Sequence, residues 1–110
     1  MRLEKKGEVL IVRLEGELDH HYASKIKDAI DGAVMVGDVR KIAFDFSRVG
    51  FMDSSGIGTI MGRYKLMQAV GGSVSAFGVS KRLDKLISMS GVKKIISIYK
   101  NEQDATRGVG

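Results

Sequence analysis

The chain has 110 residues and is 44% hydrophobic, which is enough for one domain, residues 1–110, with its own core but too little for two. It contains no run of about 18 apolar residues, and its first residues lack an apolar stretch, so we expect neither a transmembrane helix nor a signal peptide. The chain has no cysteine and only two histidines, so disulfides, thiol catalysis and a metal site are not expected, which fits a cytoplasmic protein.

The net charge of +5 makes an acidic partner or nucleic acid worth considering. The densest basic patch comprises Lys81, Arg82 and Lys85 with the Lys93-Lys94 pair. Elsewhere basic residues are interleaved with acidic ones, and the chain has no tryptophan for a base-stacking platform. We therefore interpret the patch as a solvated face and expect no direct contact with nucleic acid.

The first third of the chain predicts a hairpin followed by a helix. Residues 2–5 and 9–15 have strand patterns, and the second run is so nearly continuous in apolar residues that it should be buried on both faces. Residues 16–19 are expected to form a loop. Apolar residues then recur at intervals of three and four over residues 22–33, which predicts an amphipathic helix that ends at Gly37.

The rest of the chain alternates between strand and helix patterns. Its predicted elements are a strand over residues 41–46, a helix from Gly56 to the glycine pair 71–72, a strand over 73–77, a helix from its N-cap Ser80 through Met89, a strand over 94–99 and a short helix capped by Asn101.

This order predicts an α/β domain whose mixed, mostly parallel sheet has about five strands and is accompanied by four helices. Alternating strands and helices give parallel pairing, and the opening hairpin adds one antiparallel strand. Functional loops of such sheets gather at the carboxyl ends of the strands. Residues 17–21 and 49–55 each follow a strand, so we expect both segments to lie at that edge and to form one surface.

The most informative segment is residues 51–58, where Asp53, Ser54 and Ser55 come at the start of a predicted helix. Free backbone N–H groups and the positive end of the helix dipole point there, which makes it a natural place for a phosphate group. A plain helix cap formed by any of the three side chains is the structural alternative. These properties of the helix start do not distinguish Ser54 from Ser55 as the functional serine.

Patterns for nucleotide binding are incomplete. The glycines at 56, 58 and 62 give G-x-G-x-x-x-G, one residue longer than the dinucleotide fingerprint. They are followed by Arg63-Tyr64 instead of the Lys-Ser/Thr of a Walker A loop. We expect these small residues to let a helix pack close to the sheet.

Patterns for catalysis are incomplete too. The nucleophile elbow G-x-S-x-G is absent. A triad of a serine, His20 or His21 and Asp19 can be drawn at the shared surface, but so short a chain leaves little room for an enzymatic pocket. We predict no enzymatic activity and no cofactor; the alternative is a small nucleotide-binding or hydrolytic protein that uses Ser54, His20 and Asp53.

Three segments together resemble one family. Residues 16–21 (Gly-Glu-Leu-Asp-His-His), 51–58 (Phe-Met-Asp-Ser-Ser-Gly-Ile-Gly) and 62–65 (Gly-Arg-Tyr-Lys) are similar to the anti-sigma factor antagonists of the STAS family. The resemblance extends from about residue 9 to residue 100 and is closest to the sporulation branch that counteracts anti-sigma F factor. It implies the STAS fold.

The resemblance also implies a mechanism. The unphosphorylated antagonist binds an anti-sigma factor that is also a serine kinase, and the sigma factor is released. The kinase, to which ATP and magnesium belong, then phosphorylates the serine directly after the motif's aspartate, which is Ser54 here. A PP2C-type phosphatase restores the antagonist. The implied partner-binding residues are Glu17, Asp19, His20, Asp53, Ser54, Ser55, Gly56 and Ile57. A STAS subunit of a stress-signalling complex with another kinase is the alternative within the family.

Overall fold

A five-stranded mixed sheet with strand order β1-β2-β3-β4-β5 forms the centre of the protein. The computed structural model describes residues 1–107, so residues 108–110 of the predicted domain lie outside the described part. Strands β1 and β2 are antiparallel, and all the other neighbours are parallel, as predicted. The strands are β1 (Arg2–Lys6), β2 (Val9–Leu18), β3 (Lys41–Met52), β4 (Ser73–Phe77) and β5 (Ser97–Tyr99).

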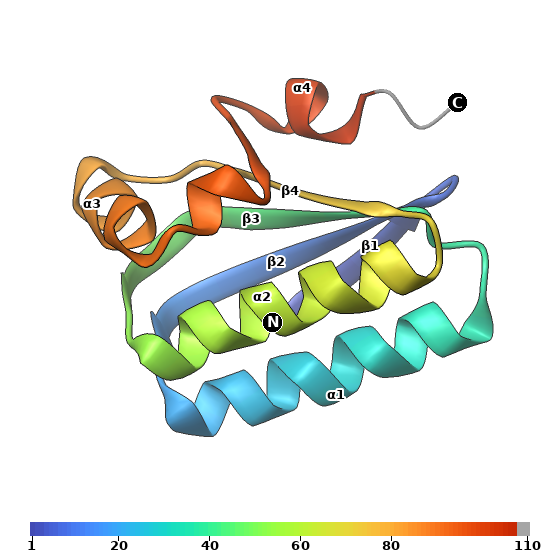
Figure 1. The fold of residues 1–110 in the computed structure, drawn as a ribbon, viewed down its shortest axis with the longest axis horizontal. Helices are drawn as coiled ribbons and strands as arrows, with labels where there is room; N and C mark the ends of the chain where they lie inside the picture. The colour runs from blue at the N-terminus through green and yellow to red at the C-terminus, as the bar shows by residue number, and fades with distance from the viewer. Residues whose placement is uncertain (108–110) are drawn as a thin grey trace.

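Helices cover the two faces of the sheet unequally. Figure 1 shows α1 and α2 running side by side across one face, while the short α4 lies over the other. The helices are α1 (His20–Val36), α2 (Ser54–Ala69), α3 (Lys81–Ser90) and α4 (Glu102–Thr106). Side chains of α1, α2 and α3 join the main core around Phe44 and Phe46. No helix within residues 1–107 is long and apolar enough to cross a membrane.

Strands β2 and β3 are longer than predicted, and their extra residues carry the segment of interest. The predicted loop at residues 16–19 is wrong in its first part, because β2 continues to Leu18. Likewise β3 continues past Phe46 to Met52. The two strands pair with each other beyond the point where β1 and β4 stop, with Leu18 opposite Met52. Polar and glycine residues therefore persist in strand conformation here because a neighbouring backbone supplies their hydrogen bonds.

The predicted strand at residues 94–99 is wrong in its first half. A 3-10 turn over Val92–Lys94 comes first, and β5 begins only at Ser97. Gly91 ends α3 in the left-handed region with φ 83°, which turns the chain and buries Val92. The apolar residues that suggested a long strand belong partly to this turn.

On the second face, α4 satisfies polar groups of the sheet. The Ser75 hydroxyl is fully buried and donates to the Ala105 carbonyl at 2.8 Å, and Lys41 Nζ donates to the Arg107 carbonyl at 2.9 Å. A small core forms beneath this helix from Val9, Ile11, Ala43, Phe77 and Ala105. The second face is thus closed by α4 near the middle of the sheet.

Candidate functional site

The starts of α1 and α2 lie side by side at the carboxyl edge of the sheet. Leu18 and Met52 end two parallel strands in direct register, and each helix begins two residues later. The Asp53 N–H also donates to the Leu18 carbonyl at 3.3 Å, which ties the two connections together. The prediction that the two segments share one edge is confirmed.

An aspartate caps each of these helices in the same way. Asp19 Oδ1 accepts from the N–H groups of His21 and Tyr22, both at 3.0 Å. Asp53 Oδ1 accepts from Ser55 N–H at 2.8 Å and from Gly56 N–H at 3.1 Å. Of the three capping alternatives at α2, the structure selects Asp53. Both serine hydroxyls are thereby free of the capping role.

The two serines differ in accessibility. Ser54 is the first residue of α2 and is exposed, whereas Ser55 is half-buried. The Ser55 carbonyl accepts a hydrogen bond from the Thr59 hydroxyl at 3.0 Å, one turn further along the helix. Exposure at the helix N-terminus therefore distinguishes Ser54 from Ser55. The properties of the helix start, inferred from the sequence, did not make this distinction.

Gly56 lets α2 approach the end of β2. A Cβ atom at this position would stand 2.8 Å from the Leu18 carbonyl oxygen and 2.8 Å from Met52 Cγ. Gly56 is buried, so it lies beneath the surface at which we expected it, and Ile57 packs partly into the main core. This close approach gives a packing reason for the first glycine of the G-x-G-x-x-x-G pattern.

The other predicted residues surround the two helix starts. Glu17 and His20 are exposed, and the rings of His20 and His21 meet edge to face at 4.9 Å. Sequence reasoning missed Phe51 as a surface residue: it lies opposite Glu17 in the β2–β3 ladder and is 36% exposed. The signal available for it was an aromatic residue at the first position of the segment 51–58.

This edge carries negative charge. The N–H of Tyr22, joined by that of His21, holds the pKa of Asp19 below its ordinary value of 3.8. Glu17, near the end of β2, and Asp53, at the start of α2, add two carboxylates to the same edge. Within residues 1–107 no hydrogen bond joins a histidine to Ser54 or Ser55, and no group of three or more side chains could hold a metal ion. Asp19, the carboxylate of the catalytic triad considered above, accepts hydrogen bonds from backbone N–H groups as a helix cap. Asp53 does the same at α2.

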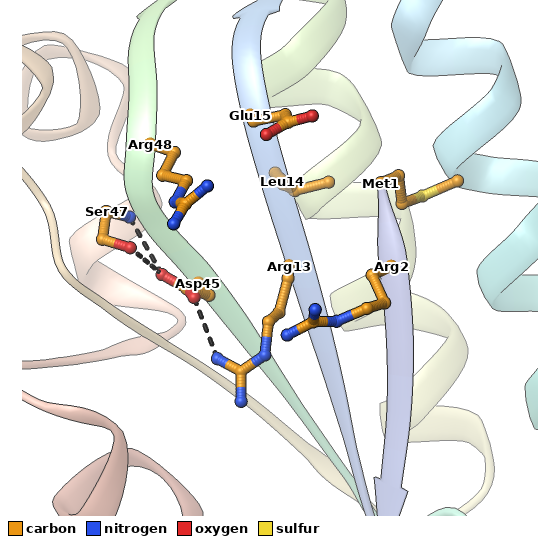
Figure 2. A pocket seen from close by; sticks show the side chains of 8 residues that line it. All are labelled: Met1, Arg2, Arg13, Leu14, Glu15, Asp45, Ser47 and Arg48. Atoms are coloured by element: carbon orange, nitrogen blue, oxygen red, sulfur yellow. Dashed lines mark hydrogen bonds and ion pairs between the residues drawn. The ribbon is translucent and has the colours of Figure 1, made fainter.

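A second polar cluster occupies the other face of the sheet, where Figure 2 shows the side chains of Arg2, Arg13 and Arg48 lining a pocket. The pocket has a volume of about 460 Å³. Arg13 lies at its centre: its guanidinium pairs with Asp45 at 3.0 Å, with Glu102 at 2.8 Å and with Glu4 at 3.0 Å. These pairs lower the pKa of Glu4 to about 2 and raise that of Arg13. The three carboxylates satisfy the Arg13 guanidinium, and their pairs with it connect β1, β2, β3 and α4. We therefore interpret this cluster as structural.

Comparison with known proteins gives consistent results. A STAS domain model matches residues 1–105. The chain is 41% identical over 105 residues to an anti-sigma F factor antagonist of Paenibacillus polymyxa, covering 96% of this chain and 90% of that protein. It is 30% identical, with the same coverage, to an anti-sigma-B factor antagonist of Listeria monocytogenes.

Two solved structures of one protein have this fold. The unphosphorylated form of the anti-sigma factor antagonist SpoIIAA superposes with a TM-score of 0.84 at 34% identity, covering 96% of this chain and 93% of that one. The phosphorylated form of SpoIIAA, described as a Bacillus cell fate determinant, superposes with a TM-score of 0.76 at 34% identity, covering 96% of both chains.

Proposed function

Because this chain belongs to the STAS domain family, we propose that it acts as an anti-sigma factor antagonist. Its unphosphorylated form binds an anti-sigma factor and thereby frees the sigma factor. The identity of 41% to an anti-sigma F factor antagonist, against 30% to an anti-sigma-B factor antagonist, favours the sporulation branch over stress signalling. The protein is a regulator with no catalytic activity or cofactor of its own, and it works in the cytoplasm.

The observation that carries the proposal is the geometry of Ser54. This serine is exposed, begins α2, and stands next to a carboxylate whose hydrogen bonds already fix the helix start. A similar protein, SpoIIAA, is known in unphosphorylated and phosphorylated forms. We assign Ser54 as the residue that the anti-sigma factor, acting as a serine kinase with ATP and magnesium, phosphorylates. A PP2C-type phosphatase reverses the modification.

The switch follows from charge and does not need a change of fold. A phosphoryl group adds nearly two negative charges at the N-terminus of α2, where the helix dipole favours an anion. The free protein therefore tolerates it. A partner that closes over Ser54 does not, because an unpaired dianion buried in an interface is costly. The contact surface comprises Glu17, Asp19, His20, Asp53, Ser54, Ser55 and Ile57, with Gly56 beneath it.

Phosphorylation of the chain by its cognate anti-sigma kinase with Mg-ATP tests this proposal. Intact mass and site mapping should find one added phosphate, on Ser54, together with loss of the complex on a sizing column. Ser54→Ala should remain unmodified while it still binds the kinase, and Ser55→Ala, the matched variant, should still receive its phosphate on Ser54. Phosphate on Ser55, or a folded Ser54→Ala protein that no longer binds, would contradict the assignment.

A further inference from the structure

The positive charge of this protein is concentrated in one segment. Residues 81–100 contain six of the 18 lysines and arginines but only one of the 13 carboxylates, so the 12 cations and 12 carboxylates outside this segment balance. Five of the six cations lie on α3 and the following 3-10 turn, and all five are exposed. We call this set the basic face: Lys81, Arg82, Lys85, Lys93 and Lys94.

The basic face is largely uncompensated. Within residues 1–107 only one of its members forms an ion pair, Lys93 with Asp84 at 2.5 Å. Lys81 and Arg82 also occupy the first turn of α3, where the helix dipole disfavours cations. The placement of these two side chains therefore stabilises neither a neighbouring carboxylate nor the helix itself.

The basic face lies beside the proposed contact surface. Helix α3 follows β4 at the carboxyl side of the sheet, just as α2 follows β3, and the two strands are parallel neighbours. The connection to α3 touches the extension of β3, since a Cβ atom at Gly78 would stand 2.9 Å from Ser47 N. Figure 1 shows α3 next to the end of β3 from which α2 starts.

We propose that the basic face is a second contact region, and that it binds an acidic surface of the same anti-sigma factor that covers Ser54. The proposal rests on the function proposed above and adds the charge of the partner. Met89 is 86% exposed on the same helix and offers an apolar contact among the cations, as protein interfaces require. No aromatic residue occurs within residues 81–98, so the base-stacking element of single-strand nucleic-acid sites is missing.

Contacts of this kind act mainly on the rate of association, which falls as salt screens the charges. The test measures association of the unphosphorylated chain with its anti-sigma factor by stopped flow at low and high salt. It compares Lys81→Glu/Lys85→Glu with Lys5→Glu/Lys65→Glu, a control that makes the same change in net charge at exposed lysines elsewhere. At low salt the first variant should associate about tenfold more slowly than the control, and the gap should close near 1 M salt, where the screening length is about 3 Å.

Each other outcome is decisive. Equal rates for the two variants would show that only net charge matters and would overturn the proposal while leaving the proposed function intact. If the wild-type chain does not bind the anti-sigma factor, both proposals fall. Fluorescence anisotropy with a 20-base-pair DNA duplex completes the test: tighter binding to DNA than to the anti-sigma factor, abolished in Lys81→Glu/Lys85→Glu, would assign the basic face to nucleic acid instead.

Discussion

Helices α2 and α3 both follow a parallel strand of the same sheet and both begin with a side-chain cap, yet the residues at their starts differ in charge. At α2 the cap is the carboxylate of Asp53, and the next two residues are serines. At α3 the cap is the hydroxyl of Ser80, which accepts from Leu83 N–H at 3.1 Å, and the next two residues are Lys81 and Arg82. The same backbone geometry is thus used for two chemically different surfaces.

The difference shows how a small sheet protein can place a phosphorylation switch at one helix start and electrostatic attraction of a partner at another. The start of α2 is an environment in which added negative charge leaves the fold intact, so it suits a reversible modification. The start of α3 has charge that its own helix does not need. In the proposed mechanism, one helix start decides whether the partner stays bound, and the other decides how fast it associates.

The largest effect is expected from Ser54→Asp. A carboxylate at this position places a second charge beside Asp53 within the closed interface, and we expect the dissociation constant for the anti-sigma factor to rise about 100-fold. Isothermal titration measures it. Ser73→Asp, at an exposed position where β4 begins, is the matched control and should bind like the wild type. Unchanged affinity in Ser54→Asp would place Ser54 outside the interface.

Gly56→Ala should destabilise the packing of α2 against the ends of β2 and β3. The added methyl group meets the Leu18 carbonyl and Met52 at 2.8 Å, so α2 must shift, at a cost of roughly 1–3 kcal/mol in the free energy of unfolding. The control is Gly58→Ala, where a Cβ atom has nothing within 4 Å. That variant should gain about 0.5–1 kcal/mol, because alanine favours a helix interior. Urea denaturation of both proteins gives the comparison, and equal stabilities would refute the close approach.

Removing each cap compares the two helix starts directly. Asp53→Ala and Ser80→Ala should each cost about 1 kcal/mol in the free energy of unfolding, since the first removes the partner of the Ser55 and Gly56 N–H groups and the second that of the Leu83 N–H. Only Asp53→Ala should also weaken binding to the anti-sigma factor, because Ser80→Ala leaves the charge of the basic face unchanged. A similar loss of affinity in both variants would mean that binding follows helix stability and not the local surface.

Acid should affect the Asp19 cap of α1 and spare the hydroxyl cap of α3. The pKa of Asp19 is lowered on folding, so its contribution to stability is present above its ordinary pKa of 3.8 and is lost as the pH falls through the lower folded value. In an NMR titration the amide signals of His21 and Tyr22 should move with a midpoint below 3.8. The Leu83 amide, bonded to Ser80, should not share that transition. A midpoint at or above the ordinary pKa would contradict the hydrogen-bonded cap.

The smallest effect is expected from Lys81→Glu alone. It replaces a cation in the first turn of α3 by an anion that faces Lys85 one turn later, so the free energy of unfolding should rise by about 0.3–1 kcal/mol. Thermal unfolding at low salt measures the change. Lys85→Glu lies beyond the first turn and should have a smaller influence. A loss of stability in Lys81→Glu would mean that Lys81 has a structural role that the ion pairs do not reveal.

The sequence predicted the order of elements and the edge at which the helix starts meet, because these follow from apolar periodicity and from the alternation of strands with helices. It also placed the key aspartates and serines at that edge, although their roles as binding and phosphorylation residues remain predictions. It failed where pairing between strands overrides local preference. Gly16 and Glu17 look like loop residues, yet they extend β2 because β3 runs beside them.

Contacts between segments far apart in the chain could not be predicted from local sequence patterns either. Nothing local to Arg13 indicates that it pairs with Glu4, Asp45 and Glu102, which lie on three other elements. Similarly, the choice of Asp53 over Ser54 or Ser55 as the cap depends on a backbone path fixed by the end of β3. Position 56 needs glycine because of its spatial neighbours, and position 78 needs it both for its neighbours and for a positive φ of 71°.

The position of Ser54 at the junction between a strand and a helix defines what kind of substrate it is. The backbone before it is extended, with Asp53 at φ −96° and ψ −172°, and the backbone after it is helical. Ser54 is exposed, and its N–H is among those at a helix start that have no partner within the helix. An enzyme can therefore contact this residue without breaking a hydrogen bond of α2. A kinase that acts here reads a folded shape, and a free peptide covering residues 47–60 should be phosphorylated far less efficiently than the whole domain.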